Sequence, residues 1–214
     1  MKPYYQDDYV TIYHGDCREI VPTLNGIVTG ELKAVCVTDP PYGMKYCSGW
    51  KARKIAGDAD TEARDAFLTL WSPRPALVFG RWDCALPDGV RVRLIWDKGD
   101  WPGMGDLALP WGPSDEEIYV IGSGFVGRRC GTVLKHNRLT GNTKHPNEKP
   151  VALLARLINH CPPCSTILDP FAGSGTTGRA AKDLGRMAVL IEIEERYCEI
   201  AAKRMRQEVL PFPR

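Results

Sequence analysis

Residues 165–178 read STILDPFAGSGTTG, a run of apolar and β-branched residues followed by an acid and a glycine-rich turn. The pattern predicts a buried strand from residue 165 and a helix over 176–184, joined by the turn. Gly173 and Gly175 would allow a tight turn and a close approach of the backbone to a ligand, and free amides at the helix start could receive a carboxylate. A strand, glycine turn and helix in this order are typical of a nucleotide-binding loop.

An acid at the end of the next predicted strand supports that interpretation. The segment 187–194 reads MAVLIEIE, and Glu192 lies near the ~20-residue spacing at which an acid commonly binds the two ribose hydroxyls. These residues predict a cofactor that carries adenosine. Walker-type chemistry is disfavoured because the sequence has no G-K-[ST]. A plain strand–turn–helix, whose glycines serve only packing, is the alternative.

Strands and helices alternate along the rest of the chain, which favours a largely parallel sheet with helices on both faces. The other predicted strands span 10–16, 34–39, 75–80, 91–98 and 116–124, and the other predicted helices span 18–24, 60–71, 151–161 and 196–205. With 214 residues, 43% of them hydrophobic, the chain fits one domain, residues 1–214. The segments 43–58, 98–113 and 125–150 resist assignment, and loops this long in a compact domain are usually functional.

Composition narrows the class of protein. The formal charge is only +2, so a polyanionic partner would have to meet a local basic patch. The first residues, MKPYYQDDYV, contain acids where a signal peptide would be apolar, and no apolar run approaches membrane-spanning length, so we expect a cytoplasmic protein with no membrane partner. The eight cysteines are scattered through predicted core segments, which favours reduced thiols.

Cys161 and Cys164 form a single C-x-x-C, in CPPC. Such a pair could ligate zinc or act as a redox pair, but a tetrahedral zinc site needs four ligands and no second C-x-x-C completes it. A rigid turn is therefore favoured, and no metal is predicted.

The stretch 38–46, TDPPYGMKY, comes directly after another apolar run, AVCV. Proline fixes φ and donates no backbone hydrogen bond, so the tandem pair ends the strand and stiffens the residues after it. An acid, two prolines and an aromatic residue at the carboxyl end of a strand are suited to holding a ligand group still.

Four segments together resemble one family. DPPY at 39–42, HPNEKP at 145–150, DPFAGSGTT at 169–177 and IEIEERYCEIAAKRM at 191–205 resemble the amino-group DNA methyltransferases, the kind found in restriction-modification systems. DPPY precedes the glycine turn, an order that identifies the circularly permuted β group. The resemblance implies an α/β, Rossmann-like fold, a mostly parallel seven-stranded sheet with helices on both faces. It also implies that S-adenosylmethionine binds across the carboxyl ends of the strands.

In that family DPPY acts on an exocyclic amine of a nucleobase, whose lone pair is delocalised into the ring. By resemblance, the Asp39 carboxylate would accept one N–H and the Pro40 carbonyl the other, with Pro41 helping to fix that carbonyl, so that the lone pair turns outward. Tyr42 would offer a flat face to a base flipped out of the duplex. No metal and no covalent intermediate are required.

The resemblance also implies which residues bind the cofactor. Asp169 would hold the methionine amino group, Phe171 would line the adenine side and Glu192 would bind the ribose. Asp16 would contact the adenine and Lys149 would lie near the methionine carboxylate, although a solvated loop charge is an equal alternative for these two. The predicted cofactor-binding residues are Asp16, Lys149, Asp169, Pro170, Phe171, Gly173, Ser174, Gly175, Thr176 and Glu192.

Two basic segments are candidates for nucleic-acid contact. Residues 118–147 contain no Asp or Glu and match the place where this family carries its target recognition region, here a short variable segment at 98–144. KYCSGWKARK at 45–54 mixes cations with aromatic residues directly after DPPY and could close over a flipped base. A merely solvated loop is the alternative for each. The candidate residues are Lys45, Trp50, Lys51, Arg53, Arg128, Arg129, Lys135 and Arg138.

Aspartate at the first motif position leans toward adenine, so the sequence predicts N6-methylation of double-stranded DNA, with relaxed sequence specificity left open. Cytosine N4-methylation, RNA methylation, methylation of a protein amide and a catalytically silent nucleic-acid-binding module are the alternatives. The family often dimerises, so a homodimer is also expected. Small chains of this kind are often phage-encoded or solitary, which suggests a bacterial or phage origin.

Overall fold

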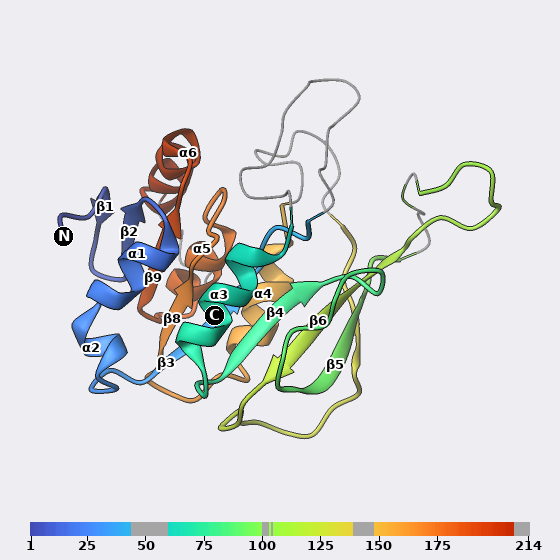
Figure 1. Ribbon diagram of the computed structural model, residues 1–214, viewed down its shortest axis with the longest axis horizontal. Helices are drawn as coiled ribbons and strands as arrows, with labels where there is room; N and C mark the ends of the chain where they lie inside the picture. Colours follow the sequence, from blue (N-terminus) through green and yellow to red (C-terminus); the bar gives the residue numbers. More distant parts are fainter. Residues whose placement is uncertain (44–59, 100–102, 104, 139–147, 208–214) are drawn as a thin grey trace, which may run out of the picture.

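The computed structural model describes residues 1–43, 60–99, 103, 105–138 and 148–207. These residues form one mixed sheet whose strands run in the order β1-β2-β9-β8-β3-β4-β6-β5-β7 (Figure 1). The centre of the sheet is five parallel strands, β2 (Val10–His14), β9 (Ala188–Glu192), β8 (Thr166–Asp169), β3 (Ala34–Thr38) and β4 (Ala76–Gly80). The predicted α/β, Rossmann-like class is confirmed.

The two edges of the sheet depart from the parallel pattern. At one edge β1 (Tyr5–Gln6) runs antiparallel to β2. At the other, β6 (Asp115–Ile121) runs antiparallel to both β4 and β5 (Val90–Asp97), and β7 (Val133–Lys135) pairs parallel with β5. All seven predicted strands are present. The described residues form a sheet of nine strands, however, so the expected count of seven is wrong. Because β1 and β7 are only two and three residues long, they carry no readable alternation.

Helices cover both faces of the sheet, as predicted. On one face lie α1 (Cys17–Ile20), the short 3-10 helix η1 (Val21–Thr23), α2 (Asn25–Val28) and α3 (Glu62–Trp71). On the other lie α4 (Val151–Ile158), α5 (Thr176–Asp183) and α6 (Glu195–Met205). The single helix predicted over 18–24 is divided into α1 and η1, with a proline in the first turn of η1.

Strand β3 shows how the two faces are built, because it is buried along its whole length. Val35 and Val37 pack into the core beneath α4, α5 and α6, whereas Ala34 and Cys36 pack into the core beneath α1 and α3. Alternate residues of a strand point to opposite faces, so a continuous apolar run is what a strand covered on both sides requires. Burial of this kind fixes the carboxyl end of β3, where DPPY begins.

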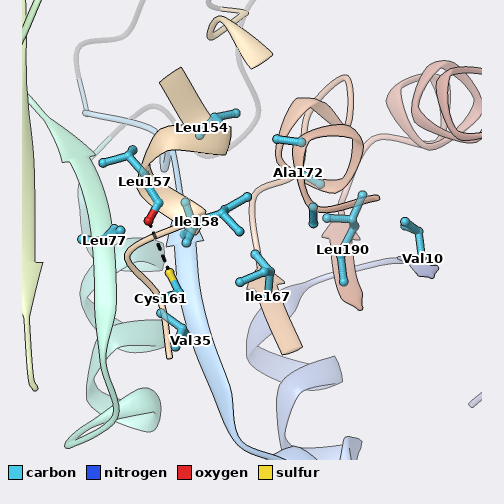
Figure 2. Close-up of a cluster of buried hydrophobic side chains, with 14 of the residues drawn as sticks. Val10, Val35, Leu77, Leu154, Leu157, Ile158, Cys161, Ile167, Ala172 and Leu190 are labelled. Atoms are coloured by element: carbon cyan, nitrogen blue, oxygen red, sulfur yellow. Dashed lines mark hydrogen bonds between the residues drawn. The ribbon is translucent and has the colours of Figure 1, made fainter. Parts of the chain in front are cut away.

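The CPPC segment is a turn between α4 and β8. Cys161 lies in the core, where its thiol donates to the carbonyl of Leu157 (Figure 2), whereas Cys164 is exposed. The two thiols therefore have different surroundings, which favours the rigid turn. Within the described ranges, no cluster of three or more His, Cys, Asp or Glu side chains could hold a metal ion. Nor does any helix in those ranges have the length and apolar character needed to cross a bilayer.

Candidate active site

The carboxyl ends of the parallel strands meet at one edge of the sheet, which is where ligands bind in folds of this class. DPPY follows β3, the glycine turn follows β8, Glu192 ends β9 and Asp16 lies two residues beyond β2. A cavity of about 300 Å³, within the range of small-molecule sites, opens at this edge. All the predicted catalytic and cofactor residues except Gly175 line it, namely Asp16, Asp39, Pro40, Pro41, Tyr42, Lys149, Asp169, Pro170, Phe171, Gly173, Ser174, Thr176 and Glu192.

Asp169 joins the two motifs. Its Oδ1 accepts hydrogen bonds from the hydroxyl of Thr38, at 2.7 Å, and from the backbone N–H of Phe171, at 3.1 Å. Thr38 is the last residue of β3, so this bond ties the strand that carries DPPY to the neighbouring strand that carries the glycine turn. Burial raises the pKa of Asp169 to about 6, although the hydrogen bonds from Thr177 and Thr38 oppose the rise.

Glu192 is held by backbone amides. Its Oε2 accepts from the N–H of Gly173 at 2.7 Å and its Oε1 from the N–H of Glu194 at 2.8 Å. Burial raises the pKa of this carboxyl group, and the two amides oppose that rise. Each carboxylate oxygen keeps a further lone pair, so the group can still accept hydrogen bonds from a ligand in the cavity.

The glycine turn itself depends on Gly175, which has φ of +78° and directly precedes α5. A Cβ built there would lie 2.7 Å from the Cβ of Ala201 on α6. Gly175 therefore faces the packed helix rather than the cavity, and it lets α5 approach α6 closely. Its place agrees with the turn-shaping role predicted for it.

The DPPY carboxylate is bonded on both oxygens. The Tyr42 hydroxyl donates to Asp39 Oδ1 at 2.5 Å, and the Lys149 ammonium lies 2.7 Å from Oδ2. Burial raises the pKa of Asp39, with Lys149 acting against the rise. The ammonium also lies over three aromatic rings, 5.1 Å from the ring centroid of Phe79, 5.7 Å from that of Tyr42 and 6.0 Å from that of Trp96. The clamp around Asp39 is thus charged and held from both sides, with the ammonium buried and the carboxylate partly open to the cavity.

Two further charged residues belong to this cluster and were missed by sequence reasoning. Glu116 Oε2 lies 2.9 Å from the Lys149 ammonium, and Glu116 Oε1 lies 2.7 Å from the ammonium of Lys98. The only signal for Glu116 is the run of three acids at 115–117 before the apolar run IYVIG, which by itself does not say which end of the strand faces the site.

Asp16 and Lys149, for which a solvated loop charge was an equal alternative, both form ion pairs with other side chains. Asp16 caps α1 by accepting from the N–H of Arg18, and it also pairs with the Arg18 side chain, whose hydrogen bonds hold the pKa of Asp16 below its usual value. Lys149 pairs with the DPPY acid, so its predicted contact with the methionine carboxylate stays a prediction.

The structure divides the basic segment predicted to contact nucleic acid. Ile121, the last residue of β6, pairs with Ala76, the first residue of β4. The chain therefore leaves β6 where β4 begins (Figure 1), away from the carboxyl ends of the parallel strands that line the cavity. Val126 then bonds to the backbone of His160, beyond the end of α4. Arg128 and Arg129 follow directly and are exposed far from the cavity edge.

The chain then returns toward the cavity. Lys135 pairs with Asp97, the last residue of β5, and both Lys135 and Arg138 are exposed on that side. Of the variable segment 98–144, residues 105–113 project beyond the sheet, with Leu107 and Trp111 exposed (Figure 1). Lys45, Trp50, Lys51 and Arg53 lie outside the described residues.

Comparison with known proteins agrees with this fold and site. The DNA methylase model of the N6/N4 family matches residues 95–203, just over half of the chain. The protein therefore belongs to the N6/N4 DNA methylase family. The type II methyltransferase M.ScaI of Streptomyces caespitosus is 26% identical over 266 residues, covering 97% of this chain and 84% of that protein.

Two solved structures resemble the chain along most of its length. The crystal structure of the M1.HpyAVI–SAM complex superposes with a TM-score of 0.64 at 26% identity, covering 91% of this chain and 99% of that one. The PvuII DNA methyltransferase, described as cytosine-N4-specific, gives a TM-score of 0.68 at 14% identity, covering 98% and 90%. At that identity the second likeness shows the fold alone. The protein is a DNA methyltransferase whose target base these relatives leave open.

Proposed function

We propose that this protein transfers a methyl group from S-adenosylmethionine to the N6 amine of adenine in double-stranded DNA, as a β-group enzyme. One observation carries the proposal. One cavity is lined by the DPPY residues that follow β3 and by the glycine-turn residues that follow β8, and these neighbouring strands are joined by the bond from Thr38 to Asp169. A methyl donor held by one strand end would therefore face an acceptor amine held by the next.

The residues present fit the donor. Asp169 is a buried carboxylate with a raised pKa, a group that gains from a cationic partner such as the methionine ammonium. Glu192 is held by two amides and can still accept from the ribose hydroxyls. Asp16 and Phe171 line the same cavity and would contact the adenine ring. S-adenosylmethionine supplies a methyl group on a sulfonium sulfur, which leaves as a neutral thioether when a nitrogen attacks the methyl carbon.

The residues on the acceptor side orient the amine. The Asp39 carboxylate accepts one N–H and the Pro40 carbonyl the other, so the nitrogen lone pair turns away from the ring and toward the donor. The proton that the amine loses on methylation passes to Asp39, whose raised pKa suits that role. The ring of Tyr42 lines the same cavity and offers a stacking face for a base flipped out of the duplex.

Lys135 and Arg138, exposed at the cavity edge, would contact phosphates, whereas Arg128 and Arg129 lie at the opposite edge. The choice of adenine over cytosine rests on aspartate at the first position of DPPY, as in the sequence resemblance. A homodimer would let one small recognition segment per subunit engage two half-sites.

The experiment that tests this function offers tritiated S-adenosylmethionine with duplex DNA, RNA or protein, followed by nucleoside analysis. We expect label in DNA as N6-methyladenine. We also expect Asp39→Ala to lower the rate at least about 100-fold while cofactor binding, measured by calorimetry, changes little. N4-methylcytosine would overturn the choice of base, and label confined to RNA or protein would overturn the choice of substrate. An unchanged rate in the Asp39→Ala variant would overturn the role of DPPY.

A further inference from the structure

Glu116 is the least expected member of the acceptor cluster. It lies near the start of β6, and its carboxylate spans two ammonium groups, Lys98 at 2.7 Å and Lys149 at 2.9 Å. Only 17% of its side-chain surface is exposed. A carboxylate held this way is a built part of the site, because leaving it unpaired at such depth would be costly.

The ammonium of Lys149 is shared between two acids. It lies 2.7 Å from Asp39 and 2.9 Å from Glu116, and 6% of the Lys149 side chain is exposed. An ammonium among aromatic rings, with little water, needs anionic partners to stay charged. The positive charge of Lys149 is therefore shared between Asp39, which would contact the substrate, and Glu116, which would not.

We propose that Glu116 is a positioning residue that sets the basicity of Asp39 by sharing the Lys149 ammonium with it. The inference rests on the proposed function, in which Asp39 accepts the amine N–H and its proton. If Asp39 faced Lys149 alone, the ammonium would offset the negative charge of the carboxylate. Asp39 would then be a weaker acceptor for both the amine N–H and the proton. A second carboxylate draws part of that positive charge away and also repels the charge on Asp39, so Asp39 stays basic while remaining held in place.

The charged groups of the cluster shift one another's pKa values. Burial, then Glu116, raises the pKa of Asp39, and Lys149 lowers it. Although burial opposes it, pairing with Lys149 and Lys98 holds the pKa of Glu116 below its usual value. The groups facing the cluster are Tyr42 after β3, Lys98 after β5, Lys149 before α4 and Asp169 at the end of β8.

The test measures single-turnover methylation of duplex DNA across pH in the full-length protein. In Glu116→Gln the acid limb of the profile should move to lower pH by about one pH unit. The plateau rate should fall about three- to tenfold, because a less basic Asp39 takes the proton less readily. In Lys98→Met the acid limb should move to higher pH, because Glu116 then carries a less compensated negative charge. Opposite shifts from two residues in contact are not what a merely structural role would produce.

Glu117→Gln is the matched control. Glu117 is the next residue of β6, is buried, and bonds to Arg93 and Tyr119 on the other side of the strand. It makes the same chemical change without touching Lys149, so its acid limb should stay at the wild-type pH.

The outcomes distinguish the inference from the function on which it rests. Acid limbs of Glu116→Gln and Lys98→Met that coincide with wild type, in variants that still bind S-adenosylmethionine, would overturn the inference and leave the proposed function intact. Shifts of the same sign in both variants would overturn it as well. A wild-type protein that methylates no DNA would instead refute the proposed function.

Discussion

Replacing Asp169 by asparagine should make the protein progressively more stable relative to wild type as pH rises, while it removes cofactor binding. Asp169 is 2% exposed, and burial raises the pKa of its carboxyl group from 3.8 to about 6. Because the folded state then holds the proton more tightly than the unfolded chain, stability from this group is complete below pH 3.8 and is lost as pH rises through 6. A rise of about two pKa units, at roughly 1.36 kcal/mol each, makes the loss about 3 kcal/mol, of which about half develops between pH 5 and pH 8.

Urea unfolding at pH 5 and pH 8 gives the measurement. The stability of Asp169→Asn relative to wild type should rise by roughly 1.5 kcal/mol between these pH values, whatever constant cost the amide adds to the hydrogen bonds. The near-isosteric Thr38→Val removes a donor to the carboxylate, so it should make the pH dependence of the wild-type acid steeper. A difference between Asp169→Asn and wild type that is equal at both pH values would refute the assignment of a raised pKa to this group.

The remaining predictions concern the turn and the DNA-facing edge. Gly175→Ala places a Cβ on a residue with φ of +78° and against α6, so it should cost about 2–4 kcal/mol of stability in the same urea assay, and a loss below 1 kcal/mol would contradict the packing. The double variant of Lys135 and Arg138 to alanine should reduce the salt dependence of DNA binding, measured as the slope of log K against log [salt], by about 1.8. The matched double variant of Arg128 and Arg129 should leave that slope unchanged, and an equal effect from both pairs would contradict the division of the basic segment.

The carboxyl-edge motifs could be predicted from sequence because each directly follows a buried strand. Asp39 and Asp169 were expected at strand ends. The parallel pairing of β3 with β8 brings those ends side by side, although Thr38 and Asp169 are 131 residues apart in the sequence. An apolar run and a glycine turn are local signals, and the shared edge follows from the parallel rule alone. The positions of Glu192 and Asp16 along the cavity follow in the same way.

The antiparallel direction of β6 explains two features that sequence reasoning did not foresee. Strand β6 was predicted, but its antiparallel direction was not, because the residues of a strand do not encode its direction. An antiparallel strand brings its first residues to the cavity edge, which places Glu116 beside Lys149. It also delivers the following loop to the opposite edge, which carries Arg128 and Arg129 away from the site. The missed acid and the distance of the two arginines from the cavity have the same cause.

The two acids of the site, Asp39 and Asp169, obtain their counter-charge differently, and this difference bears on the order in which cofactor and base bind. Asp39 has an internal cation, Lys149, at 2.7 Å, so the cost of burying its charge is offset before any substrate arrives. Among the described residues, the donors to Asp169 are neutral, the Thr38 hydroxyl and the Phe171 amide among them, and burial raises its pKa to about 6. A cationic methionine ammonium would supply the missing charge, so part of the stability lost by burying Asp169 would be recovered on binding the cofactor.

Asp39 also raises the pKa of Asp169, so neutralising Asp169 would in turn ease the ionisation of Asp39. In the proposed function, filling the cofactor side therefore favours the charged form of Asp39, the acid proposed to accept the amine N–H, which argues that the cofactor is bound before the base is taken up.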